Sequence, residues 1–176
     1  MSNFIINSSI FIHNITSVKI FTTFFIIFAV YFILRKQYFF LKIFATSIVA
    51  TSALTILLKN LTKIARPENA ILTLTDYAFP SGHAAIAFAI LTFGFFLIFH
   101  EDKKGFDKNI TANNGERNIT MSCEVKNIFA GILIIFAIVI SGSRLVLNIH
   151  TFWQTLFGAV LGVVVSVLVI LFFRKK

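Results

Sequence analysis

Long apolar runs separated by short polar stretches dominate the chain. The sequence predicts a helix over each of five runs, near residues 18–34, 39–58, 84–99, 128–142 and 152–173. Several are shorter than the roughly 20 residues that cross a bilayer, so their helices are expected to extend into the flanking polar positions. Because the hydrocarbon core offers the backbone no hydrogen-bond partners, the expected fold class is all-α.

Residues 1–18 depart from this pattern, because Asn7, Ser9 and His13 interrupt the apolar positions. The mixture favours an interfacial helix or a partial span, and it lacks the basic start of a cleaved signal peptide. The chain is therefore predicted to be one domain over residues 1–176, a polytopic membrane bundle of five or six transmembrane helices.

Composition supports the membrane assignment. Of 176 residues, 57% are apolar, only 13% are charged and 23 are Phe. An ordinary soluble domain is about half apolar and a quarter charged, and it could not hide this much apolar surface from water. The net charge of +9 does not indicate nucleic-acid binding, because the basic residues stand at the ends of apolar runs.

The Lys and Arg residues near the span ends predict the orientation. In a five-span arrangement, one side carries Arg35, Lys36, Lys103, Lys104, Lys108, Arg117, Lys126, Arg174, Lys175 and Lys176. The other side carries Lys19, Lys59, Lys63, Arg66 and Arg144. The first side is therefore expected to be cytoplasmic, which makes 100–126 a cytoplasmic loop and turns the loops 59–82 and 146–151 outward.

The first outward loop begins with two cations, Lys59 and Arg66, and Pro67 follows directly. Seven residues are about two helical turns, so on a continuing helix both cations would lie on one face and could reach one anion. Pro67 would then end that helix. Taken alone, the pair could equally be interfacial cations that snorkel toward water.

The same loop ends in Pro-Ser-Gly-His, directly before an apolar run. Ser81 is a good N-cap, Gly82 allows a ligand to approach the backbone, and the helix N-terminus favours an anion. His83 could donate a proton to a leaving oxygen. The plain alternative is a capped helix start with an interfacial histidine.

The second outward loop carries Ser143 and Arg144, then His150, with Gln154 one turn further on. Arg144 offers a fork for phosphate oxygens, and a neutral His150 nitrogen could attack phosphorus. An arginine and histidine at the aromatic belt, beside Trp153, are the alternative. The charge count places all three groups on one side of the membrane, and this joint placement favours phosphoryl transfer.

The three groups resemble the signature of the type 2 phosphatidic acid phosphatase (PAP2) superfamily, Lys-x6-Arg-Pro, Pro-Ser-Gly-His and Ser-Arg-x5-His-x3-Asp. Order and spacing match from about residue 40 to the end. The resemblance implies a six-helix membrane bundle with its site at the outer face, with His83 as general acid and His150 as nucleophile. The phosphate-binding residues that it implies are Lys59, Arg66, Ser81, Gly82, Ser143 and Arg144.

Two features depart from the family pattern. Gln154 stands where the family usually has Asp. The stretch around His150 resembles the dolichyl-pyrophosphate and glucose-6-phosphatase branches, which also carry Gln at this position. A Gln oxygen can accept the ring N–H of His150, but without a full negative charge. The N-terminal span also looks truncated.

The sequence thus predicts a membrane phosphatase that cleaves a lipid phosphate or pyrophosphate through a phosphohistidine. The candidate substrates are undecaprenyl pyrophosphate, lipid A and a phosphatidyl-type phosphate. The residue bias suggests an AT-rich bacterial genome, and hence the inner membrane with the site facing the periplasm or exterior. A lipid phosphotransferase, or a non-catalytic membrane protein with a decayed site, are the alternatives.

No metal or other cofactor is expected. The outward loops hold only two acids, Glu68 and Asp76, and the chain has one cysteine, Cys123, in the loop assigned to the cytoplasm. These residues do not make a metal-ligand cluster. The partners expected are the lipid substrate and the bilayer.

Overall fold

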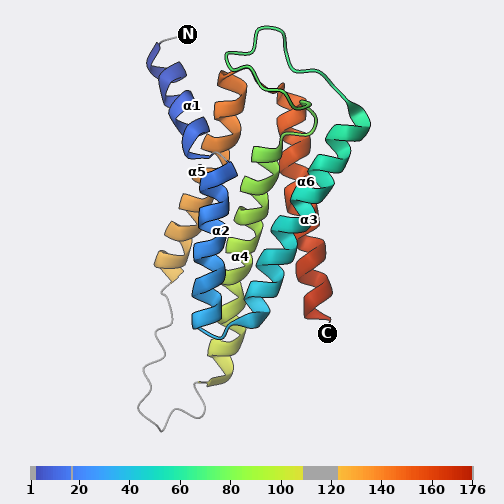
Figure 1. Ribbon diagram of the computed structural model, residues 1–176. Coiled ribbons are helices and arrows are strands. Elements are labelled where there is room, and N and C mark those ends of the chain that lie inside the picture. Colours follow the sequence, from blue (N-terminus) through green and yellow to red (C-terminus); the bar gives the residue numbers. More distant parts are fainter. Residues whose placement is uncertain (1–2, 17, 109–122, 176) are drawn as a thin grey trace.

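The computed structural model describes residues 3–16, 18–108 and 123–175. These residues form six α-helices and no strand (Figure 1), and the helices are α1 (Asn3–Ile15), α2 (Val18–Leu34), α3 (Tyr38–Thr62), α4 (Gly82–Lys108), α5 (Cys123–Val146) and α6 (Phe152–Arg174). The prediction of an all-α membrane bundle is confirmed.

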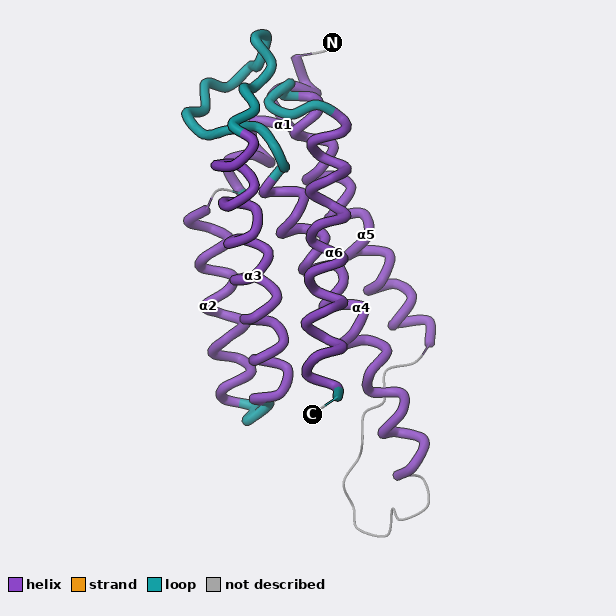
Figure 2. Tube along the Cα trace, turned by 90° about the vertical axis from the view of Figure 1, so that its right-hand side faces the viewer, coloured by secondary structure: helices purple, strands orange, loops and turns teal. Residues whose placement is uncertain are grey.

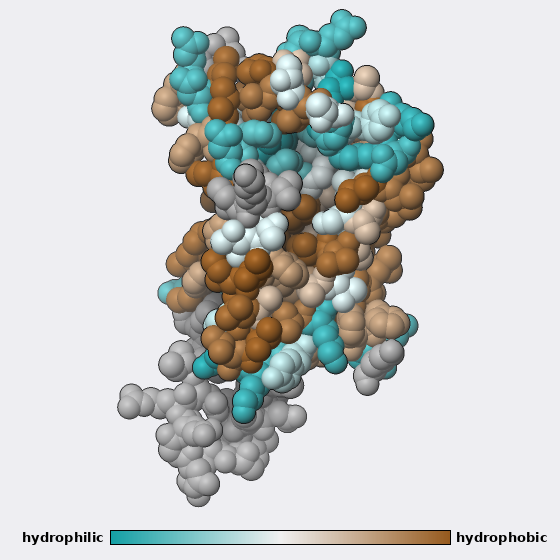
Figure 3. All heavy atoms as spheres, in the orientation of Figure 1, coloured by the Kyte–Doolittle hydropathy of each residue, from teal (hydrophilic) through white to brown (hydrophobic). Residues whose placement is uncertain are grey.

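Four described helices are long and apolar enough to cross a membrane, namely α3, α4 over Gly82–His100, α5 and α6. The apolar part of α2, Phe21–Leu34, is shorter. Many large apolar side chains are exposed on these helices, including Phe24, Ile135 and Leu168, and brown residues cover the middle of the face in Figure 3. Such an apolar surface is stable only in lipid.

The polar ends of the bundle divide into two groups (Figures 1 and 2). The turn between α2 and α3, the start of α5 and the end of α6 lie at one end. The loop 63–81 and the connection 147–151 lie at the other. Both stretches that were expected to carry chemistry therefore belong to the same end of the bundle.

Two sequence expectations about helix ends are wrong. The helix that carries Lys59 does not continue to Arg66, because α3 ends at Thr62 and Lys63 takes a left-handed conformation with φ 48°. This residue turns the chain out of the helix one turn before Pro67. Arg66 thus reaches the site from a loop.

The loop 100–126 is also partly helical. α4 continues to Lys108, and α5 begins at Cys123. A helix keeps its backbone hydrogen bonds when it leaves the membrane, so the end of an apolar run does not mark the end of its helix. Residues 109–122 of this loop lie outside the described residues.

The tightest helix packing joins α4 to α6. A Cβ built on Gly158 would lie 2.4 Å from the carbonyl oxygen of Ser81, and one built on Gly162 would lie 2.0 Å from that of Ala85. Small residues four apart let two helix backbones touch, which is a common mode of packing in membranes. Ser81 belongs to the Pro-Ser-Gly-His motif and directly precedes α4, so this contact holds the motif against α6.

We expect Gly162→Ala to force α6 away from α4, because a carbonyl oxygen cannot yield as a flexible side chain can. Overpacking of this kind costs about 1–3 kcal/mol in free energy of unfolding. Thermal unfolding in detergent measures the loss. Gly131→Ala on α5 is the matched control, because its Cβ would meet nothing within 4 Å; equal stability of the two variants would contradict the tight contact.

Candidate active site

Backbone hydrogen bonds join the loops at the polar end of the bundle. The Ser81 N–H donates to the Gln154 carbonyl over 3.0 Å, which links the start of α4 to the start of α6. The Ile71 N–H donates to the Leu147 carbonyl over 2.9 Å, which links the loop 63–81 to the α5–α6 connection. The second and third sequence groups are therefore held together by main chain, independently of any ligand.

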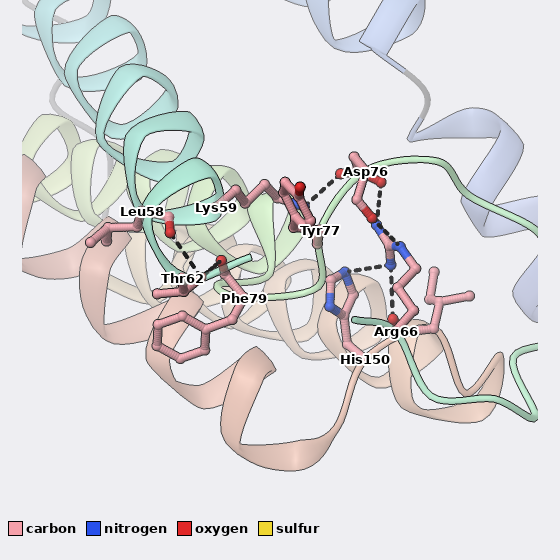
Figure 4. Close-up of polar contacts among 9 residues, drawn as sticks. Leu58, Lys59, Thr62, Arg66, Asp76, Tyr77, Phe79 and His150 are labelled. Atoms are coloured by element: carbon pink, nitrogen blue, oxygen red, sulfur yellow. Dashed lines mark hydrogen bonds and ion pairs between the residues drawn. The ribbon is translucent and has the colours of Figure 1, made fainter. Parts of the chain in front are cut away.

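The two cations of the first group meet on a carboxylate, Asp76 (Figure 4). Lys59 Nζ lies 2.5 Å from one carboxylate oxygen, and Arg66 NH2 lies 2.5 Å from the other. Arg66 Nε also donates to the Asp76 carbonyl, and Lys59 Nζ donates to the Tyr77 carbonyl. Lys59 and Arg66 therefore lie close together, as expected, but the bend of the loop brings them together and not a continuous helix.

Asp76 is ionised across the ordinary pH range. Burial raises its pKa, but hydrogen bonds from Lys59 and Arg66 and the charges of both outweigh burial and lower the pKa to about 2. Its side chain remains 56% exposed. An anion that approaches from water would therefore meet this carboxylate on the two cations.

Arg66 also contacts the predicted nucleophile. Its NH1 donates to the Ile149 carbonyl over 2.8 Å and lies 3.3 Å from His150 Nε2. Because a guanidinium can only donate, Nε2 is the acceptor and the ring proton is on Nδ1. The lone pair of Nε2 therefore faces the Arg66 guanidinium.

His150 is held as a neutral imidazole. It is buried, and burial together with the charges of Arg66 and Lys59 lowers its pKa to about 4. The Ala78 carbonyl and the Gln154 side chain raise this pKa only in part. Above about pH 4 the ring is unprotonated and able to attack.

The Gln154 side chain lies near His150, but its oxygen is engaged at the start of its own helix. Its side-chain oxygen accepts from the Thr151 N–H over 2.9 Å, while the Thr151 hydroxyl accepts from the Gln154 N–H, which together form a capping box at the start of α6. His150 Nδ1 is buried without a hydrogen-bond partner among the described residues. Gln154 occupies the third helical position, where its side chain folds back onto the cap.

Arg144 and His83 form a second cluster with two residues of the N-terminal segment. Arg144 NH1 lies 2.5 Å from His13 Nδ1, and NH2 donates to the Thr16 hydroxyl. His83 Nε2 lies 2.9 Å from the Thr16 carbonyl and, facing a carbonyl, must be the donor. Neither His13 nor Thr16 belongs to a sequence motif, and the polar interruptions in residues 4–17 were the only signal.

Three small residues were also expected at the phosphate. Ser81 is fully buried, and its hydroxyl has no partner within the described structure, so it can still serve a ligand. Ser143 is already occupied, since its hydroxyl donates to the Ile140 carbonyl over 2.7 Å. At Gly82 a Cβ would meet Thr55 at an ordinary 3.5 Å, so packing within the chain does not require glycine there.

The two clusters adjoin. The pKa of His13 is lowered by burial and then by the charges of Arg144 and Arg66, one from each cluster. Among the described residues, no group of three His, Cys, Asp or Glu side chains lies close enough together to hold a metal ion. The site therefore presents cations, a neutral imidazole with its lone pair exposed to them, and a second histidine with a ring proton.

Comparison with known proteins identifies the family. The family model described as the PAP2 superfamily matches residues 40–176, which is most of the chain. The chain belongs to the PAP2 superfamily. None of the proteins with curated descriptions matches it.

Two solved PAP2 structures have the same fold. One is the first transmembrane PAP2-type phosphatidylglycerolphosphate phosphatase from Bacillus subtilis, with a TM-score of 0.76 and 20% identity over 99% of this chain and 79% of that one. The other is Aquifex aeolicus LpxE, with a TM-score of 0.68 and 20% identity over 97% of this chain and 87% of that one. The superfamily resemblance drawn from the three motifs is thus confirmed.

Proposed function

We propose that this PAP2 protein is a lipid phosphatase that hydrolyses a lipid phosphate or pyrophosphate through a phosphohistidine at His150. The observation that carries the proposal is the His150 ring, whose Nε2 lone pair faces Arg66 beside Lys59 and Asp76 (Figure 4). A nucleophile and its phosphate-binding cations are thereby in contact before substrate arrives. Such preorganisation is the main source of catalysis in phosphoryl transfer.

The reaction would proceed in two displacements. His150 Nε2 attacks phosphorus as the bond to the lipid or pyrophosphate oxygen breaks. His83, which takes up a second ring proton when the anionic substrate binds, gives its Nε2 proton to that oxygen and is left as a neutral imidazole. The Thr16 carbonyl holds this proton in the free protein. Water then attacks the phosphohistidine, returns a proton to His83, and releases phosphate and the neutral His150 ring.

The substrate phosphate would compete with Asp76 for Lys59 and Arg66. Lys59 and Arg66 both pair with Asp76 in the free protein, and its one negative charge offsets one of their two positive charges. Arg144 is hydrogen-bonded to neutral groups. A phosphate with two negative charges would displace the single charge of Asp76 toward water, where its exposed side chain can be solvated. Lys59, Arg66 and Arg144 then stabilise the phosphate oxygens without a metal ion.

The substrate class follows from the membrane setting. The site lies at the end of a lipid-exposed bundle, so a phosphate on an apolar anchor can reach it from the bilayer. The B. subtilis relative is described as acting on phosphatidylglycerolphosphate. Undecaprenyl pyrophosphate, lipid A and phosphatidyl-type phosphates are therefore the candidates, with water preferred to a lipid acceptor.

Purified protein in detergent with EDTA is expected to release phosphate from at least one of these lipids and to accumulate an acid-labile, base-stable phosphoenzyme. His150→Ala should lose at least about 10³-fold in turnover and all of the phosphoenzyme, because the nucleophile is removed. Phosphate release measures the turnover, and retention of radiolabelled phosphate on the protein measures the phosphoenzyme.

His100→Ala is the control, because His100 lies among Phe40 and Phe96 at the opposite end of α4. It should stay within about twofold of wild type, since it touches no part of the site. A requirement for Mg²⁺ would refute the metal-free mechanism. Transfer of label to an added alcohol or lipid in place of water would indicate the phosphotransferase.

We also propose that the site faces away from the cytoplasm, in the inner membrane of a bacterium. The turn with Arg35 and Lys36 and the end of α6 with Arg174 lie at the end of the bundle opposite to the site, and basic ends stay on the cytoplasmic side. Cys123, an exposed free thiol at the start of α5, lies at this basic end.

A membrane-impermeant thiol reagent should leave Cys123 unlabelled in intact cells and label it after lysis. Because it is the only cysteine of the chain, any labelling of intact cells would place the site in the cytoplasm. Mass spectrometry of the purified protein reads the result.

A further inference from the structure

The end of α1 contacts two motif residues, although it lies outside the segment 40–176 that matches the family. α1 packs along α5 (Figure 1), and its last turn brings His13 and Thr16 to Arg144 and His83. The sequence assigned this segment only an interfacial or partial-span role. It is instead hydrogen-bonded to Arg144 through the side chains of His13 and Thr16, and to His83 through the Thr16 carbonyl.

Arg144 depends on this contact for its position. It is fully buried, its NH1 donates to His13 and its NH2 donates to Thr16, and its Nε has no partner among the described residues. No carboxylate pairs with it among the described residues, whose ion pairs both involve Asp76. A buried guanidinium with neutral partners keeps its full charge for an incoming anion.

The hydrogen-bond chemistry fixes the state of both partners. Arg144 can only donate, so His13 Nδ1 accepts and the neutral ring carries its proton on Nε2. The Thr16 hydroxyl donates to the Ile12 carbonyl over 2.7 Å, which leaves its lone pair to accept from Arg144. The Thr16 carbonyl accepts from His83, so one residue ties the cation to the acid.

We propose that the end of α1 is part of the active site and that His13 is a positioning residue that aims Arg144 at the substrate phosphate. The inference rests on the proposed function. His13 must stay neutral for this role, and the groups that face it are Arg144 on α5, His83 on α4 and Arg66 in the loop. These surroundings disfavour a proton on Nδ1, which would repel Arg144.

Two substitutions separate positioning from bulk packing. In His13→Asn the side-chain oxygen lies near the place of Nδ1 and can still accept from Arg144. In His13→Gln the oxygen lies near the place of Nε2, one bond too far. We expect Asn to retain vanadate affinity within about threefold and Gln and Ala to weaken it roughly tenfold or more, the usual effect of losing a hydrogen bond to a charged group.

The experiment measures vanadate affinity by thermal stabilisation in detergent, and phosphate release from the lipid panel, for wild type and each variant. Asn14→Ala is the control, because Asn14 is the exposed neighbour of His13 on the same helix. We expect KM to rise more than kcat falls in His13→Ala and His13→Gln. Should His13→Ala fail to fold, the Asn and Gln variants carry the comparison.

The outcomes separate the two proposals. Wild-type vanadate affinity in His13→Ala or His13→Gln, or equal losses in Asn and Gln, would overturn the positioning role and leave the phosphatase standing. The predicted vanadate pattern without phosphate release from any lipid would support the role of α1 and overturn the proposed lipid phosphatase. A wild-type protein that does not bind vanadate would overturn both.

Discussion

Three cationic side chains, Lys59, Arg66 and Arg144, are held at one end of the helix bundle, where burial removes much of the water that would solvate them. Charge in such a place costs free energy unless it is paired or hydrogen-bonded. Asp76 pairs with two of the three and offsets one positive charge, and neutral groups hold the third. These cations therefore carry more positive charge than Asp76 balances, which favours the binding of a further anion.

The helix packing makes this arrangement possible. Gly158 and Gly162 bring the backbone of α6 against α4, which places Ser81 within a hydrogen bond of Gln154. Arg66 and Lys59 then act on His150, whose pKa they lower beyond the effect of burial. Helix packing and the charge around His150 are therefore coupled, because a shift of α6 would move His150 relative to Arg66.

The sequence predicted the membrane helices and the family well, because both follow from local pattern. Apolar runs mark spans, and fixed spacing marks the groups at 59–67, 80–83 and 143–154. The prediction failed where the position of a side chain depends on how the backbone turns after a helix. Lys63 in a left-handed conformation ends α3 early, so Arg66 comes from a loop and meets Asp76.

Two other features could not be predicted from spacing. Gln154 lies one turn beyond His150, yet its side chain folds onto the helix cap, since the backbone of Thr151 is the nearer donor. His13 and Thr16 enter the site through the tertiary packing of α1 on α5, which no periodicity in residues 4–17 encodes. Long-range contacts of this kind arise from the whole fold.

The most direct test of the account is a structure of the protein with vanadate bound. Vanadate adopts the five-coordinate geometry of phosphorus during transfer. The account predicts vanadium bonded to His150 Nε2, its equatorial oxygens held by Lys59, Arg66 and Arg144, and the Asp76 carboxylate moved away from at least one cation. Vanadate bound elsewhere, or bound here with another atom than His150 Nε2 at the apical position, would contradict it.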